Sequence, residues 1–550
     1  LLLIIVAQGS IQAGHLRRFA IVSSSCSIDS MPGEMRTITL DELAKHNTAG
    51  DMWMAIEGDV YDVSKFGQIH PGGEPIIQQL AGNDVTNEFF ELHRRDVLSK
   101  YARLKIGRLD TAQEPVTAEE QGPSLVPFAE IPAFQGQHSP YYGESHKRFL
   151  LGIRSIIQKE LEPIAESSDL SGEYPDEDLR EMLGMNALMV SRMGPGPWMQ
   201  HLEELGIKLP GGISPSEYDY FHEMLAHQEI ARLGRSGFID SIGTGWLISA
   251  PAVYNFGSEE MRNSVGKQLL TGKKWSALAI SEPFAGSDVA GVRTTAEKTP
   301  DGKYYIVKGI KKWITEGMYA DYFVTAVRTG GKGAGGMSML LIERGPGVET
   351  KQIKTTYSTC CGTALVIFNN VKVPVENLMG KEGNGFKQVM YNFNHERWMI
   401  VCNLIGQARA ALVDTFMWTQ QRSIFGKKLI DQPVIRNKLA SATTALESVQ
   451  TYIETVTYDM KMTKGGAVGE RLSRPIAMLK YQATRASWAI ADDCVQIFGG
   501  RGITRTGMGA KVESFKNFAK YAAVYGGSEE IMADLSIKQA MKAYPQQAKL

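Results

Sequence analysis

The chain has 550 residues and a formal net charge of −1 at pH 7. This length exceeds what one hydrophobic core usually organises, so at least two domains are expected. The near-zero charge and the lack of a Lys/Arg block argue against a nucleic-acid binder. Five cysteines without a C-x-x-C spacing favour neither a disulfide framework nor a zinc site, and they indicate a reducing compartment.

Residues 1–34 are expected to form a disordered leader. The chain begins LLLIIVAQGS without a methionine, and this apolar run is too short to span a membrane. The stretch that follows lacks acidic residues and contains Arg and Ser, which is a weak match to a transit peptide. We favour a translated leader, with Met31 or Met35 as the start.

Residues 35–110 are predicted to form a small α+β domain with two notable histidines. His70 stands in QIHPGGEPI, a tight turn, and His93 follows the amphipathic segment that contains Phe89, Phe90 and Leu92. A haem iron with two axial imidazoles needs two histidines on opposite sides of an apolar pocket. One histidine alone is more often structural than a ligand, but here there are two.

The segment WMAIEGDVYDVSKFGQIHPGG, followed by AGNDVTNEFFELH and YARLKIGRL, resembles a cytochrome b5 domain over its full length. The resemblance implies that His70 and His93 are the axial ligands of a b-type haem. It also implies a haem that transfers single electrons and does not bind oxygen, because both axial positions are filled. No hydrophobic tail follows this domain, so no membrane span is expected.

The rest of the chain is predicted to form a helical, then a β, then a helical unit. Residues 111–140 are rich in Pro, Gln and Glu without an apolar period, which indicates a linker. Helical spacing follows over 141–275, short alternating strands over 276–378, and helical spacing again over 379–543. GKGAGG (331–336) matches G-x-G-x-x-G but precedes a predicted strand, so a hairpin turn is expected rather than a dinucleotide site.

Four segments of this larger unit carry residues suited to a cofactor. ALAISEPFAGSDVAGVRTTAEK places small and hydroxyl residues on a turn after a strand, and KKWITEG places an indole and a hydroxyl on one strand face. RSIFGKKLIDQP and QIFGGRGITR each combine a glycine turn with Arg or Gln, which suits diphosphate or adenosine contacts. Taken alone, each segment is equally compatible with an ordinary structural role, such as that of a core tryptophan.

In their order and spacing, these segments resemble the acyl-CoA dehydrogenase family across about residues 141–543. The resemblance implies helical, β-barrel-like and helical domains, and FAD as the cofactor. The residues implied in FAD binding are Ser281, Gly286, Ser287, Trp313, Thr315 and Ser528, and, toward the FAD of a neighbouring subunit, Arg422, Phe425, Gln432, Gln496, Gly499, Gly500 and Gly502. This cross-subunit arrangement implies a homo-oligomer, in this family usually a dimer of dimers.

The catalytic base of the family is expected on a helix in this chain. Gly526, in YGGSEEI, stands where much of the family has the Glu of a Tyr-Glu-Gly-Thr stretch. Branches that act on isovaleryl and long-chain acyl groups instead carry the base at a Glu-Arg pair, and NFNHERWMI has Glu396 followed by Arg397. The resemblance therefore implies that Glu396 is the base, reaching into the room left by Gly526, and that Arg397 positions the thioester or CoA.

Joining the two halves gives a functional hypothesis. Oxidation of a fatty acyl-CoA would feed electrons to the tethered haem, instead of or alongside an electron-transfer flavoprotein or another cytochrome acceptor. The alternatives are a docking or sensing haem, an acyl-CoA oxidase, and a non-catalytic flavin- and haem-binding scaffold. The tail at 544–550 ends in Ala-Lys-Leu, similar to the peroxisomal Ser-Lys-Leu address, so a peroxisomal location is expected, with the mitochondrial matrix or cytoplasm as alternatives.

Overall fold

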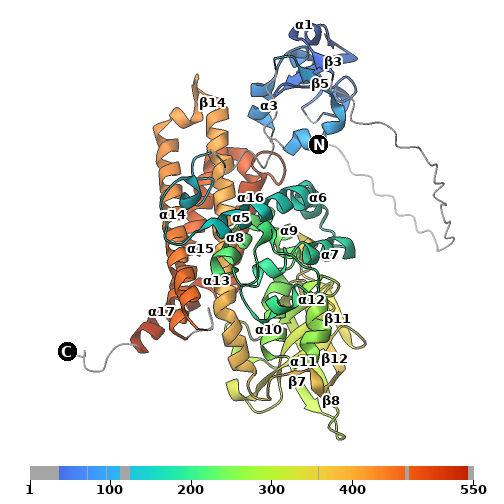
Figure 1. Cartoon of the computed structure of the whole chain (residues 1–550), viewed down its shortest axis with the longest axis vertical. Coiled ribbons are helices and arrows are strands. Elements are labelled where there is room, and N and C mark those ends of the chain that lie inside the picture. The colour runs from blue at the N-terminus through green and yellow to red at the C-terminus, as the bar shows by residue number, and fades with distance from the viewer. Residues whose placement is uncertain are drawn as a thin grey trace, which may run out of the picture. The chain divides into compact units, whose positions relative to one another are not determined.

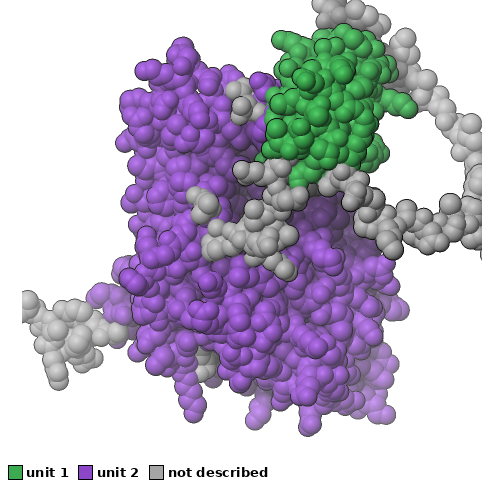
Figure 2. All heavy atoms as spheres, turned by 45° about the horizontal axis from the view of Figure 1, so that its top comes forward, with its two compact units in different colours: residues 1–85, 103–113 green, residues 86–102, 114–550 purple. Residues whose placement is uncertain are grey.

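A computed structural model of the chain describes residues 36–70, 72–93, 96–111, 124, 126–356, 358–464 and 470–542. The chain divides into two compact units, residues 1–85 with 103–113 and residues 86–102 with 114–550 (Figure 2). The predicted leader and the Ala-Lys-Leu tail lie outside the described residues, as does most of 112–125.

The first unit is built on a small mixed sheet. Its strands lie in the order β1 (Thr37–Ile38), β5 (Lys105–Leu109), β4 (Asp59–Asp62), β3 (Asp51–Ile56) and β2 (Asn47–Thr48). β1 and β5 run parallel, and the other pairs are antiparallel. The helices α1 (Leu40–Leu43) and α2 (Glu74–Leu80) complete the described part of this unit.

The second unit begins with helices, as its apolar spacing predicts. They are α3 (Thr86–Leu92), α4 (Asp96–Lys100), α5 (Glu144–Ile156), α6 (Glu162–Ser171), α7 (Glu177–Met185), α8 (Tyr220–Ala231), α9 (Ser236–Ser241), α10 (Thr244–Phe256), α11 (Glu259–Met261) and α12 (Lys267–Leu270). Asp219 caps α8 by accepting from two backbone amides. α8 contacts α5, α13 and α14, so residues 221–231 are all buried rather than only one face.

An open sheet follows these helices. Its strands are β6 (Ser276–Ala279), β7 (Thr295–Lys298), β8 (Tyr304–Ile314), β9 (Tyr322–Arg328), β10 (Met337–Glu343), β11 (Val348–Gln352), β12 (Ala364–Pro374) and β13 (Leu378–Met379). The order is β11-β12-β8-β7-β9-β10-β13, with β6 on β9. The barrel-like closure that we expected does not occur in the described residues, because the end strands β11 and β13 do not pair. GKGAGG joins the antiparallel strands β9 and β10, which confirms the predicted hairpin.

The chain ends in long helices. They are α13 (Gly385–Gln421), α14 (Pro433–Met462), α15 (Ser473–Phe498), α16 (Ala510–Val524) and α17 (Glu529–Lys542), with the small hairpin β14 (Ser423–Ile424) and β15 (Lys427–Lys428) after α13. Figure 1 shows the hairpin and the open sheet at opposite ends of this unit, joined by α13. Within the described ranges, no helix has the length and apolarity that crossing a bilayer requires.

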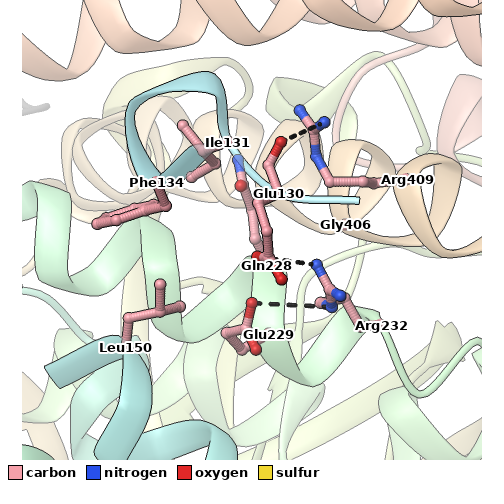
Figure 3. A pocket seen from close by; sticks show the side chains of 9 residues that line it. All are labelled: Glu130, Ile131, Phe134, Leu150, Gln228, Glu229, Arg232, Gly406 and Arg409. Atoms are coloured by element: carbon pink, nitrogen blue, oxygen red, sulfur yellow. Dashed lines mark hydrogen bonds and ion pairs between the residues drawn. The ribbon is translucent and has the colours of Figure 1, made fainter. Parts of the chain in front are cut away.

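The second half of the predicted linker is part of the folded body. Glu130 is 2 % exposed, and its carboxylate receives two hydrogen bonds from Arg154 of α5, at 3.0 and 2.8 Å. Arg232, which caps the end of α8, and Arg409 of α13 donate to backbone carbonyls of this segment, at Ala129 and Glu130 respectively. In Figure 3 both arginines point toward Glu130. Three arginines from three helices therefore anchor the chain just before α5.

We predict that Glu130→Gln lowers the free energy of unfolding of the second unit by about 2 kcal/mol at pH 7, because it weakens the charge-assisted hydrogen bonds from Arg154 to Glu130, while Arg154 keeps its bonds to Glu229. Burial alone would raise the pKa of Glu130, but Arg232 and Arg154 hold it below its ordinary value. The stabilisation is thus present at neutral pH and is lost as the pH falls through the lowered pKa.

Urea unfolding of the holoprotein at pH 7 and at acidic pH measures this effect. Glu217→Gln is the control, because Glu217 pairs with Arg148 in a solvent-exposed ion pair, and such pairs contribute little to stability. Equal stability of the Glu130→Gln variant and the wild type at pH 7 would contradict the anchoring role.

Candidate active site

Glu396 lies near the N-terminal end of α13 and is buried. It is 7 % exposed, and burial raises the pKa of its carboxyl group to about 7, against the opposing effects of Arg397 and Lys480. Its Oε2 atom has no hydrogen-bond partner in the part of the chain that the structure describes. A buried carboxylate that titrates near neutrality can accept a proton at physiological pH.

Gly526 leaves the space that Glu396 uses, as the sequence predicts. A Cβ atom at Gly526 would lie 3.7 Å from Oε1 of Glu396 and only 2.4 Å from Cδ1 of Ile400. The backbone of Gly526 has a φ of +63°, which L side chains rarely adopt. The turn between α16 and α17 is therefore specific for glycine at this position.

Arg397 holds the same turn from α13. Its Nε donates to the carbonyl oxygen of Gly526 at 3.2 Å, and its guanidinium lies over the ring of Phe393. The side chain is buried, which argues against an ordinary surface charge pair. Glu396 and Arg397 thus meet the Gly526 turn together, although their partners are about 130 residues away in the sequence.

A second buried cluster includes His395, the neighbour of Glu396 in the sequence, and sequence reasoning did not find it. Nε2 of His395 lies 2.6 Å from Oε1 of Glu223 on α8, and both residues are next to His227. Burial would lower the pKa of His395, but Glu223 raises it above its ordinary value. The charge of His395, one residue before the base, is therefore matched by Glu223.

The residues expected beside the flavin ring gather at the end of the open sheet. Ser281 follows β6, and its carbonyl oxygen accepts from the amide of Lys312, which brings it next to Trp313 at the end of β8. Trp313 is 54 % exposed at a φ of +68°, and Thr315 lies in the turn that follows. Gly286 and Ser287 are exposed on the loop after β6.

The other residues expected to bind FAD lie at the far end of α13. Arg422 ends the helix, Phe425 at the tip of the hairpin is 94 % exposed, and Gln432 caps α14. Gln496, Gly499, Gly500 and Gly502 belong to the end of α15 and the short helix after it. This segment is at the same end, because Phe498 and Arg501 both contact the indole of Trp418.

Glu396 and Arg422 do not meet at one site within one chain. They stand 26 positions apart along continuous helix, which corresponds to about 39 Å. Trp313, beside the open sheet, and Phe425, at the hairpin after α13, are both exposed aromatic residues. A planar cofactor or a partner surface could cover each of them. Ser528 lies on the side of Glu396, immediately before α17.

The two histidines expected to bind haem fall in different units. His70 belongs to the first unit, where a Cβ at Gly72 would lie 2.8 Å from its imidazole, so glycine permits this ring position. His93 belongs to the second, where its Nδ1 donates to the carbonyl oxygen of Phe89. Exposed apolar side chains flank each histidine: Ile69 is 66 % exposed and Leu92 is 46 % exposed. Ligation of one haem by both histidines stays a prediction.

This helical, sheet and helical fold holds a buried carboxylate, Glu396, that can accept a proton near neutral pH, as an enzyme that abstracts a proton requires. Comparison with protein families gives three matches. They are the cytochrome b5-like heme/steroid binding domain over residues 39–110, the acyl-CoA dehydrogenase middle domain over 277–371, and the acyl-CoA dehydrogenase C-terminal domain over 383–541.

Individual relatives agree with these matches. The acyl-CoA dehydrogenase apdG of Emericella nidulans is 40% identical over 428 residues, 78% of this chain and 98% of that protein. The mitochondrial long-chain specific acyl-CoA dehydrogenase of Sus scrofa is 28% identical over 418 residues, 72% of this chain and 87% of that protein. The structure of butyryl-CoA dehydrogenase from Megasphaera elsdenii matches with a TM-score of 0.64 and 26% identity, over 74% of this chain and 100% of that one.

The chain therefore belongs to the acyl-CoA dehydrogenase family of oxidoreductases and carries a cytochrome b5-like domain before the dehydrogenase fold. Acyl-CoA dehydrogenases bind FAD and cytochrome b5-like domains bind haem, so its cofactors are FAD and haem.

We predict that flavin reduction by an acyl-CoA rises about tenfold per pH unit up to pH 7 and then levels off, because only ionised Glu396 accepts a proton. Glu396→Gln is expected to lower the rate by about 10³-fold at pH 8. Anaerobic stopped-flow absorbance from pH 5.5 to 8.5 measures both effects.

The matched control is Glu454→Gln. Glu454 is also buried with a raised pKa, but it lies on α14 and accepts from Tyr142, so its loss is expected to leave the rate unchanged. A wild-type rate that does not vary with pH across this range would contradict the role of Glu396.

We also predict that Gly526→Ala lowers both stability and the rate of flavin reduction. The new methyl group would displace Ile400 and, through it, the helix face that carries Glu396. The positive φ alone is expected to cost about 1 kcal/mol when alanine replaces glycine. Gly507→Ala measures this cost by itself, because Gly507 has a similar φ and open space around it. Thermal unfolding and stopped-flow rates of both variants are the measurements, and equal effects of the two substitutions would refute the close contact.

Proposed function

We propose that the protein is an FAD-dependent dehydrogenase that introduces an α,β double bond into a fatty acyl-CoA, with Glu396 as the base. The observation that carries this proposal is the burial of Glu396 beside Gly526, with an ionisable oxygen that meets no donor within the described residues. A thioester is the fitting substrate class, since its carbonyl group stabilises the charge left when the α-proton departs.

The chain's own residues supply the proton chemistry. Glu396 takes the α-proton, and the incoming acyl chain removes further water from around the carboxylate, which strengthens its interaction with nearby charges. Arg397 orients the Gly526 turn against the carboxylate and is proposed to position the thioester end of the substrate. FAD, when bound, supplies the acceptor for the hydride that leaves the β-carbon.

A homo-oligomer completes the FAD site in this proposal. Ser281, Ser287, Trp313 and Thr315 would hold the flavin ring, and Arg422, Phe425 and Gln432 of a second copy would hold the rest of the cofactor. The separation of about 39 Å along α13 supports this division, because one chain cannot bring both groups together. The nearly complete exposure of Phe425 supports it as well.

The haem is proposed as an electron acceptor for the reduced flavin. His70 and His93 would hold the haem in a domain of the same chain as the dehydrogenase, and that haem would supply a one-electron acceptor. Residues 110–127 lie between β5 and the anchored residues 128–131. A segment of that length spans at most about 65 Å, which keeps the effective concentration of the haem near millimolar.

We predict that mixing the holoprotein with a panel of fatty acyl-CoAs without oxygen first removes the flavin absorbance and then produces the ferrous haem spectrum. The rate at which ferrous haem appears is expected to be independent of protein concentration, because the electron moves from flavin to haem within one assembly. Anaerobic stopped-flow spectroscopy over a tenfold range of protein concentration measures this dependence.

His93→Ala is the control for the haem route, and it is expected to leave flavin reduction intact while removing the haem signal. Loss of flavin absorbance with haem still ferric would leave a dehydrogenase with a docking or sensing haem. Rapid peroxide formation in air would instead favour an acyl-CoA oxidase. No flavin change with any acyl-CoA would overturn the proposed activity in favour of a binding scaffold.

A further inference from the structure

Lys480 is a buried lysine that the proposed reaction does not yet use. It lies on α15, is fully buried, and its Nζ donates to the carbonyl oxygens of Ala522, Tyr525 and Gly527 at 3.1, 2.8 and 2.5 Å. Carbonyl oxygens only accept, so all three hydrogen bonds need an N–H group. A neutral amine has two, and an ammonium has three, so this geometry requires the charged form.

The three carbonyls belong to the end of α16 and to the turn that follows it. Ala522 lies in α16, and Tyr525 and Gly527 stand on either side of Gly526 in the turn that leads to α17. Arg397 of α13 donates to the carbonyl of Gly526 itself, so two cations from two different helices hold four carbonyl groups of the α16 end and this turn. The turn cannot move away from Glu396 without leaving a buried cation short of acceptors.

Lys480 and Glu396 border the same small space. A Cβ at Gly526 would lie 3.7 Å from Oε1 of Glu396 and 3.8 Å from Cε of Lys480. No carboxylate lies within 4.0 Å of the Lys480 ammonium among the described residues, so its positive charge is not cancelled by a direct ion pair. The charge of Lys480 lowers the pKa of the Glu396 carboxyl group, and a charge acts more strongly in a dry site than in water.

Other charged groups also lie around Glu396. On α13 these are His395, which Glu223 of α8 neutralises, and Arg397, which is bound to a carbonyl of the turn and also lowers the pKa of Glu396. Tyr525 faces Glu396 from the turn, and Glu529 of α17 acts on Lys480 from a greater distance. Burial and Arg397 lower the pKa of Lys480, while its three acceptors favour the proton.

We propose that Lys480 is a positioning residue for Glu396: its ammonium fixes the Gly526 turn and keeps the carboxylate ionised when an acyl chain dries the site. This inference rests on the proposed role of Glu396 as base. The lysine does not touch the reacting atoms. It acts through the turn and through its charge, and the two actions are separable by substitution.

The test is the pH dependence of anaerobic flavin reduction in the FAD-loaded full chain. Lys480→Met is expected to move the midpoint upward by about one pH unit, because Glu396 loses a stabilising charge. Lys480→Arg keeps the charge but cannot match the three-carbonyl geometry, so its rate is expected to fall while its midpoint stays within about 0.3 unit of wild type. Lys438→Met, which removes a lysine paired with Asp493, is the matched control with an unchanged midpoint.

FAD content and thermal unfolding confirm that each variant is folded. A lower rate of Lys480→Met with an unmoved midpoint would overturn the proposal, because a purely structural lysine has that effect. A midpoint that moves as far in Lys480→Arg as in Lys480→Met would also overturn it. If Glu396→Gln itself still reduces flavin at the wild-type rate, the proposed function fails instead, whatever the lysine variants show.

Discussion

The site depends on keeping one carboxylate buried without a direct partner. Water stabilises an ionised carboxylate strongly, so removing it favours the protonated form and raises the pKa. At Glu396 this effect brings the pKa to about 7, and the nearby charges of Arg397 and Lys480 prevent it from rising further. The rest of the local structure follows from this balance: a glycine that leaves room, two cations that hold its turn, and a Glu223–His395 pair whose charges cancel beneath the base.

The long helix α13 connects this chemistry to assembly. In its N-terminal third it presents Glu396, and just after its last residue it presents Arg422 and the exposed hairpin. The rigid helix holds these two groups about 39 Å apart, and in the proposed homo-oligomer the second end serves the FAD of another copy. Residues 128–131, which three arginines bind, belong to the same folded unit as α13.

Local patterns predicted much of this, and long-range contacts explain the rest. The alternation of helical and strand spacing predicted the order of elements, and the Glu396–Arg397 pair with Gly526 gave a candidate base through the family resemblance. The barrel-like closure was wrong because periodicity identifies strands but does not report which of them pair. Glu130 was assigned to a linker because its arginine partners are 24 to 279 residues away. Lys480 was missed too, although Ile476, Leu479 and Ala483 mark its helix face as buried.

The most direct test isolates proton removal from electron transfer. An acyl-CoA with sulfur in place of the β-carbon can lose its α-proton but cannot deliver a hydride, and its enolate gives a long-wavelength charge-transfer band against oxidised flavin. Titrating this ligand into the wild-type holoprotein and into Glu396→Gln, at pH 8, compares deprotonation alone. We expect a strong band in the wild type and none in the variant at equal ligand occupancy. A band of equal intensity in both proteins would contradict Glu396 as the base.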